Sequence, residues 1–227
     1  MLPWIIESSP DRLAAVRDTS LAKLVRDDLL AAILQGDLTP GQRINEPDVA
    51  ARLQVSRVPV REALRELESS GLVVARKHSG VFVRLLDAGE IADLYKMRAL
   101  LDGYAGRCVA QLSPEKRSNL LTRLSASVAL MHQAVQGQDI QAYYAENLRF
   151  HWSIVVAAES ATLTEIYQNL IQKLHLARLK NLAKDVGMQT SIAEHAEMID
   201  ALGSADPARC EAMLTQHVTD AYARLIT

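Results

Sequence analysis

From residue 88 to residue 226 the sequence is helical in pattern and carries no strand signal. Apolar residues recur at helical spacing in six segments, and the breaks between them carry typical helix-starting or helix-ending residues such as Ser113-Pro114, Gly137 and Gly187. The segments are 88–110, 114–136, 139–158, 161–184, 190–203 and 206–226. Such a succession predicts an antiparallel bundle of six helices.

The N-terminal part has a different pattern. Helices are predicted over 21–35, over the brief segment E-P-D-V-A-A-R-L and from residue 57 to about 70, with Ser56 as a candidate N-cap of the third. A short strand is expected at 43–45, and residues 72–83 are typical of a hairpin with a basic tip. This order predicts a winged helix-turn-helix. The fold is therefore expected to be mainly α, with an arm at 1–19, a winged helix at 20–84 and a helical domain at 85–227.

Composition limits the cellular setting. No apolar run approaches the ~18 residues that span a bilayer, and the first residues lack a basic segment ahead of an apolar one. Cys108 and Cys210 lie about a hundred residues apart with no C-x-x-C motif, so they are expected to be reduced. These features favour a cytoplasmic protein with no membrane partner.

Basic residues concentrate in the predicted winged helix. Between residues 52 and 77 there are six basic residues against three acidic ones, although the whole chain has a net charge of −2. Arginine can bond a phosphate or the edge of guanine with two hydrogen bonds, and a serine at a helix N-terminus can bond a phosphate. The candidate DNA-binding residues lie on one face of the third helix and at the hairpin tip: Ser56, Arg57, Arg61, Arg65, Arg76, Lys77, His78 and Gly80.

An alternative to DNA binding is that this basic face is an ordinary solvated surface with ion pairs. Arg61 and Arg65 can instead pair with Glu62, Glu66 or Glu68 on a solvated helix surface. Two arginines four residues apart repel one another unless an anion lies nearby, and this repulsion favours the DNA-binding interpretation.

Three histidines lie on the inward faces of three different predicted helices, namely His151, His195 and His217. A single buried histidine is usually a hydrogen-bonded core residue, whereas three that converge in a bundle resemble metal sites built from facing helices. No close-spaced motif such as H-E-x-x-H accompanies them, so both interpretations stay open. Asn147 precedes His151 by four residues and shares its helix face. His132 and His175 are expected to be ordinary core or surface residues.

The run L-T-P-G-Q-R-I-N-E-P-D-V-A-A-R-L-Q-V-S-R-V-P-V-R-E-A-L-R-E-L-E-S-S-G-L-V resembles the N-terminal domain of GntR-family bacterial transcription regulators. The resemblance covers about residues 20–84. It implies that Ser56, Arg57 and Arg61 occupy operator-contacting positions and that His78 to Gly80 form the wing tip. Pro47 departs from the family pattern, in which a polar or charged residue is common.

The C-terminal part resembles the FCD domain of the FadR subfamily, through L-Y-K-M-R-A-L-L-D-G-Y-A, N-L-R-F-H, E-H-A-E-M-I-D-A-L and Q-H-V. The resemblance implies a divalent metal held by an Asp four residues before a first His and by two later His. These positions are occupied by Asn147, His151, His195 and His217. Arg98, at an early arginine position of the family, becomes a candidate for binding an effector carboxylate, although Asp102 can simply pair with it.

Three neutral imidazoles and a neutral amide leave the charge of a divalent ion uncompensated, so such a site favours an anionic ligand. Histidine-rich ligation suits Zn or Ni. The expected function is a homodimeric transcription regulator, a repressor released from a palindromic double-stranded operator by a small carboxylate effector. One alternative is a metal-free effector pocket. The other is a metal-dependent hydrolase. It is disfavoured by the DNA-binding half, and because Glu146 and Glu194, which adjoin the candidate ligands Asn147 and His195 in sequence, point about 100° away from them.

Overall fold

The structure is a computed structural model that describes residues 20–179 and 187–226, which form nine helices and three strands. Its described residues divide into two compact units, one of 20–87 with 171–179 and one of 88–170 with 187–226. The arm expected at 1–19 lies outside the described residues. The predicted fold class, an N-terminal winged helix-turn-helix followed by a helical bundle, is confirmed.

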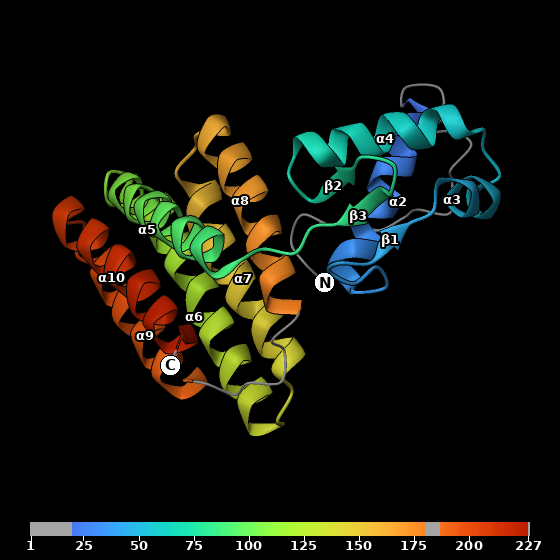
Figure 1. The fold of residues 1–227 in the computed structure, drawn as a ribbon. Helices are drawn as coiled ribbons and strands as arrows, with labels where there is room; N and C mark the ends of the chain where they lie inside the picture. The colour runs from blue at the N-terminus through green and yellow to red at the C-terminus, as the bar shows by residue number, and fades with distance from the viewer. Residues whose placement is uncertain (1–19, 180–186, 227) are drawn as a thin grey trace. The chain divides into compact units, whose positions relative to one another are not determined.

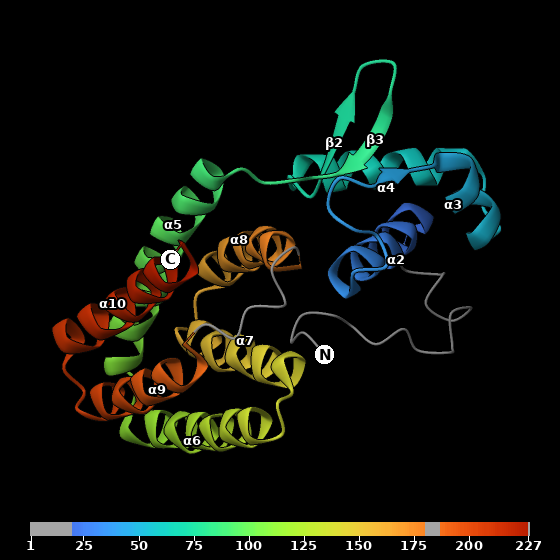
Figure 2. The same cartoon turned by 60° about the horizontal axis from the view of Figure 1, so that its bottom comes forward.

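The first unit contains three helices and a small antiparallel sheet. Helix α2 (Leu21–Gln35) is followed by β1 (Arg43–Ile44), α3 (Glu46–Leu53), α4 (Arg57–Ser69), β2 (Val73–Arg76) and β3 (Gly80–Val83), and the strand order is β1-β3-β2. Helix α2 begins where the Ser20 side chain accepts a hydrogen bond from the Lys23 amide (3.2 Å). It ends at Gly36 with a φ of 86°, a conformation that glycine adopts without strain. Figure 2 shows hairpin β2–β3 projecting from the helices of this unit.

The core of this unit is built mainly from one face of α2 and one face of α4. Its buried members include Val25, Leu29, Ile33, Val60, Leu64 and Leu67. Leu176, from the end of helix α8 (Ala161–Leu179), joins the same core. His175 beside it is buried, and its Nε2 lies 2.8 Å from the Leu34 carbonyl oxygen. The C-terminal part of α8 therefore belongs to the winged-helix unit, a placement that periodicity alone did not predict.

The second unit is all helical, with α5 (Ala88–Ala110), α6 (Pro114–Gln136), α7 (Ile140–Ala157), the first part of α8, α9 (Met188–Gly203) and α10 (Pro207–Ile226). Helix α5 packs along α10, while α6 packs against α7 and α9 (Figure 1). Close approach of α5 and α10 depends on Gly106, where a Cβ would lie 2.9 Å from Leu214 Cδ2. The six predicted helical segments are confirmed within the described residues, since 180–184 of the fourth lie outside them. No described helix is long and apolar enough to cross a membrane.

Candidate metal centre and DNA-reading surface

Helices α7, α9 and α10 bring His151, His195 and His217 together in the interior of the helical unit. All three side chains are buried, and one ring nitrogen from each lies within 4.8 Å of those of the other two. The Nε2 atoms of His151 and His195 are 3.3 Å apart. The inward faces predicted from sequence thus converge on one point.

Each histidine has an acceptor at its other ring nitrogen. The Nδ1 contacts are His151 with Asp102 Oδ1 (2.7 Å), His195 with the Ser191 carbonyl oxygen (2.5 Å) and His217 with Glu194 Oε2 (2.7 Å). Carboxylate and carbonyl oxygens only accept hydrogen bonds, so Nδ1 of each ring carries the proton. In its neutral form each ring therefore carries a lone pair on Nε2.

Two lone pairs that face each other at 3.3 Å cannot form a hydrogen bond. A cation between the rings would satisfy both, and oriented imidazoles whose other nitrogen donates to an acceptor are the usual arrangement of metal-binding histidines. Burial, with Arg98 and His217 adding to it, lowers the pKa of His151 to about 4. Burial and the two neighbouring histidines lower the pKa of His195 well below its ordinary value. The His151 and His195 rings are therefore neutral near pH 7, the form that binds a metal.

Asp102 on α5 anchors the first histidine. It is fully buried, accepts a hydrogen bond from the Tyr167 hydroxyl at 3.0 Å and lies 3.4 Å from Arg98 Nε. Burial alone would raise the pKa of this carboxyl, but His151 and Arg98 hold it below its ordinary value. Asp102 is therefore ionised and fixes the orientation of His151. Sequence spacing connected Asp102 only to Arg98.

Glu194 plays the corresponding part for the third histidine. It receives two hydrogen bonds from Arg224, at 2.6 and 2.8 Å, in addition to the one from His217. Burial opposes ionisation, but His217 and Arg224 lower the pKa of Glu194 to about 2. From the sequence, Glu194 was considered only in relation to its neighbour His195, so its contact with His217 on another helix was not predicted.

The two remaining predicted site residues lie at the edge of the centre. Asn147 places its amide nitrogen 3.3 Å from His195 Nε2, so its oxygen is not the atom directed at that ring. Arg98 is buried and pairs with Asp102, yet its Nε makes no hydrogen bond within the described residues. The pairing that sequence spacing suggested for Arg98 is thus present, and a role for Arg98 in effector binding stays a prediction.

On the winged helix, Ser56 occupies the N-cap position of α4, but its side chain makes no capping hydrogen bond. The Arg57, Arg61 and Arg65 side chains that follow are exposed on one face of α4. Arg57 and Arg61 share a carboxylate that sequence spacing did not suggest, since both contact Glu46 of α3. Of the partners proposed from sequence, Glu66 instead pairs with Arg26 and Glu68 accepts from the Ala75 amide.

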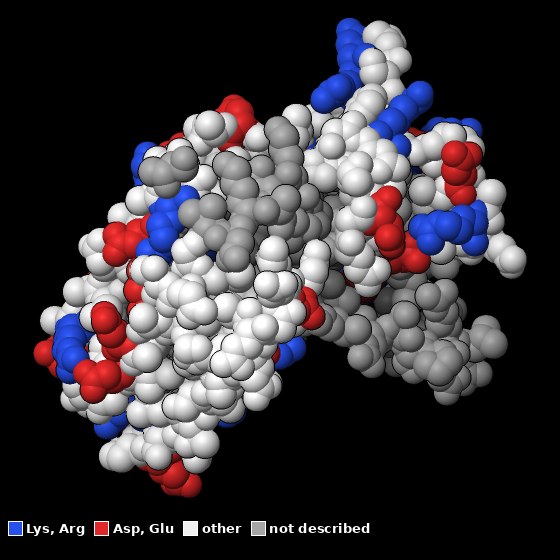
Figure 3. All heavy atoms as spheres, turned by 90° about the horizontal axis from the view of Figure 1, so that it is seen from below, with Lys and Arg blue, Asp and Glu red and all other residues white. Residues whose placement is uncertain are grey.

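The hairpin tip carries the remaining candidates. The Arg76 guanidinium lies 4.4 Å from the centre of the Phe82 ring, and the turn brings His78 and Gly80 to positive φ values of 61° and 101°. Lys and Arg side chains gather on this projecting hairpin (Figure 3). Arg43 of β1 adds to them, since a Cβ on Gly80 would lie 3.0 Å from Arg43 Nε. The sequence pattern did not identify Arg43, because only strand pairing brings it beside the hairpin.

Residues 93–220 match the FCD domain, and residues 21–83 match the family described as bacterial regulatory proteins, gntR family. The chain is 34% identical over 200 residues to a probable D-xylose utilization operon transcriptional repressor of Paenarthrobacter nicotinovorans, which covers 88% of this chain and 86% of that protein. It is 27% identical over 143 residues to the gluconate operon transcriptional repressor of Bacillus subtilis (strain 168), with 63% and 57% covered.

A crystal structure of a GntR transcriptional regulator from Rhodococcus sp. RHA1 superposes with a TM-score of 0.73 at 26% identity and covers 92% of this chain and 98% of that one. Both halves of the chain, the relatives and the solved structure agree. This chain therefore belongs to the GntR family and is a transcription regulator in which an FCD domain follows the DNA-binding domain.

Proposed function

We propose that the protein is a repressor that binds a palindromic operator as a homodimer and is released when a small organic acid binds at a divalent metal in its helical unit. The observation that carries this proposal is the convergence of three buried imidazoles whose Nδ1 atoms are all engaged. Two relatives, named as operon repressors, support the repressor role.

The donor set fits a metal of the Zn or Ni type. Such ions accept imidazole nitrogen readily, whereas Mg and Mn favour more carboxylate oxygen. His151, His195 and His217 would hold the ion through Nε2, and a turn of the Asn147 amide would direct its oxygen at the same point. The ion would supply Lewis acidity for binding a carboxylate.

An anionic effector follows from the charge of the site. The two carboxylates nearest the histidines, Asp102 and Glu194, are paired with Arg98 and Arg224, so they do not offset the charge of an ion. A carboxylate in the open coordination positions would do so. Arg98, buried with an unsatisfied Nε, is the proposed second contact for this carboxylate.

Dimerisation through the helical unit is supported by an apolar stripe on α5. Met97, Leu100 and Tyr104 are spaced three and four residues apart, share one helix face and are each about half exposed. Large apolar side chains in such a row usually mark an interface. A second copy of the chain, packed on this stripe, would give the two recognition helices that a palindromic operator requires.

The effector must bind one state of the protein more tightly than the other. To switch nearly all molecules, it must favour that state by about 10⁴-fold.

Two alternatives remain for the site. In a metal-free pocket the three histidines would bond an organic ligand directly, and metal analysis of protein purified without a nickel column separates this case. A hydrolase would need a base, yet Asp102 and Glu194 are both held by hydrogen bonds. Turnover of a candidate acid ester by the metal-loaded protein would support that second alternative.

The experiment uses the full chain and the DNA duplex that it selects from a randomised library. Arg61→Ala should abolish binding to this duplex, while metal content and dimerisation are kept. His151→Ala should bind the duplex normally but lose the response to carboxylates such as gluconate. Unchanged affinity of Arg61→Ala would contradict the DNA-reading role of α4, and an unchanged response of His151→Ala would remove the metal centre from the mechanism.

A further inference from the structure

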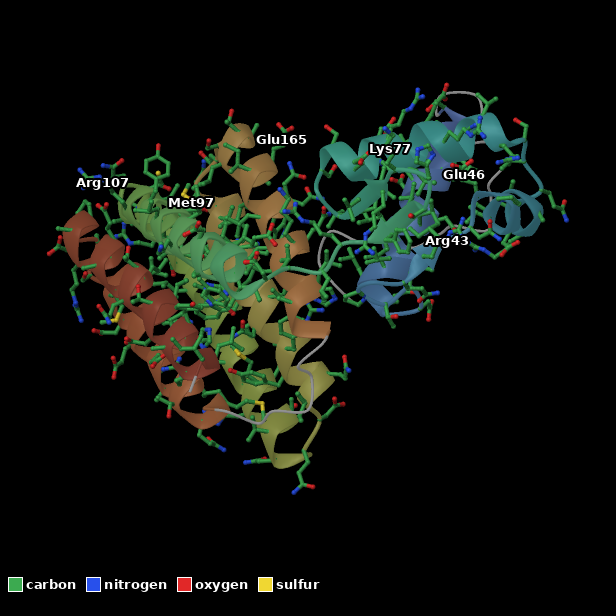
Figure 4. All side chains as sticks on the ribbon, viewed as in Figure 1. Arg43, Glu46, Lys77, Met97, Arg107 and Glu165 are labelled. Atoms are coloured by element: carbon green, nitrogen blue, oxygen red, sulfur yellow. The ribbon has the colours of Figure 1, made fainter. Side chains whose placement is uncertain are left out.

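Glu46 lies where a carboxylate is least expected on a DNA-binding surface. It begins α3 (Figure 4). It contacts two of the arginines of α4 that are proposed to face the operator. Its Oε2 lies 2.8 Å from Arg61 Nε and 3.4 Å from Arg57 Nη2. The side chain is 25% exposed, less than half the exposure of either arginine. The hydrogen bond from Arg61 leads the causes that lower the pKa of Glu46, so the carboxylate is ionised near pH 7.

The atom through which Arg61 is held decides what it can still do. A guanidinium has five N–H groups, and the contact with Glu46 engages the single one on Nε. The four N–H groups on the two terminal nitrogens stay available, and these are the ones that can bond the O6 and N7 atoms of guanine end-on. Glu46 therefore restrains a long, flexible side chain without occupying its base-reading end. Such restraint removes part of the ordering cost of binding.

The other cations of this surface are arranged differently. Arg65, Arg76 and Lys77 have no carboxylate partner within the described part of the chain. Such side chains suit phosphates, whose recognition requires charge but little orientation. On this surface Arg57 and Arg61 are thus paired with a carboxylate, whereas the second group of cations is not.

The carboxylate also weakens attraction to any DNA, because it offsets part of the charge of Arg57 and Arg61. Its removal would let both arginines reach phosphates, which binds every sequence more tightly and steepens the salt dependence. A purely structural ion pair between α3 and α4 predicts otherwise, since its loss would change stability slightly and leave sequence discrimination as it was.

We propose that Glu46 is a positioning residue that holds Arg61 for base reading and keeps it from binding phosphates indiscriminately. This inference rests on the proposed contact of Arg61 with the operator. It assigns to Glu46 a share of sequence specificity without a contact to DNA of its own.

The test compares Glu46→Gln with Glu62→Gln in the full chain. Glu62 is exposed on α4 next to Arg61 and has no arginine partner in the described residues, so its replacement removes the same charge as a matched control. Affinity is measured for the duplex selected by the wild-type protein and for a shuffled duplex of the same composition. Glu46→Asp, which keeps the charge on a shorter side chain, is the third variant.

Glu46→Gln should lower the ratio of the two affinities at least about fivefold, the smallest effect of losing a bidentate base contact. Its shuffled-duplex affinity should rise with a steeper salt dependence. Glu62→Gln should change the affinities for both duplexes by the same factor. Glu46→Asp should lower the ratio of the two affinities without raising the affinity for the shuffled duplex. If Glu46→Gln instead behaves like Glu62→Gln while Arg61→Ala weakens binding, the role of Glu46 is overturned and the proposed function stands. Unchanged binding by Arg61→Ala would overturn both.

Discussion

Replacement of Asp102 by Asn tests the metal centre without touching a histidine. The Asn side chain has the same shape and can still accept from His151 Nδ1, but it lacks the charge that Arg98 and Tyr167 surround. Mutation of a partner that orients a metal-binding histidine typically weakens metal affinity about 10- to 100-fold, or about 1.4 to 2.7 kcal/mol. We expect a loss in this range for Zn.

The same change should lower the free energy of unfolding of the metal-free protein by more than it lowers the free energy of Zn binding. The Asp102 side chain is fully buried, and its replacement by Asn leaves the buried Arg98 cation without a carboxylate partner. Breaking a buried ion pair from one side costs about 3 to 5 kcal/mol. Urea unfolding of the metal-free protein measures this cost.

Zn affinity is measured by competition with a chromophoric chelator, under conditions where both proteins remain folded. Glu211→Gln is the control, because Glu211 forms an exposed pair with Arg107 on the same two packed helices, α5 and α10. This control should bind Zn like the wild type. An Asp102→Asn protein that is folded and binds Zn with wild-type affinity would refute the orienting role of Asp102.

Three further predictions concern charge, pH and assembly. Asn147→Asp should tighten Zn binding and weaken binding of anionic effectors, and calorimetry that finds no gain for Zn would exclude residue 147 from the ligands. In metal-free protein the pKa of His151 is about 4, against about 6.5 when unfolded. Between these two pH values His151 takes up a proton only in the unfolded chain. The contribution of His151 to the free energy of unfolding is therefore fully present above about pH 6.5, and the free energy of unfolding falls by about 3 kcal/mol towards pH 4. Urea unfolding should show a weaker fall for His151→Gln, and an identical fall would contradict this assignment. Leu100→Glu should convert dimer to monomer in light scattering, whereas a dimer that persists would exclude the α5 stripe as the interface.

The sequence predicted local features well because each depends on neighbouring residues. The periodicity and the stop at Gly36 gave α2 its observed bounds, Leu21–Gln35. Helical spacing was enough to place His151, His195 and His217 on the inward faces of their helices. Packing of those helices in a bundle was then enough to bring the three side chains together. The resemblance to the GntR family supplied the positions on α4.

The sequence did not predict three hydrogen bonds that join separate elements. Asp102 reaches His151 from α5 to α7, Glu194 reaches His217 from α9 to α10, and Glu46 reaches Arg61 from α3 to α4. Each depends on how two helices pack, which spacing within one helix does not encode. The burial of Leu176 in the winged-helix core was missed for the same reason.

The most direct test of the metal centre is a crystal structure of the Zn-loaded protein with anomalous scattering data collected at the zinc edge. We expect one strong anomalous peak about 2.0 to 2.1 Å from Nε2 of His151, His195 and His217, with Nδ1 of each ring still bonded to Asp102, Ser191 or Glu194. A peak bound through Nδ1, or Zn-soaked crystals with no peak among the three rings, would contradict the account.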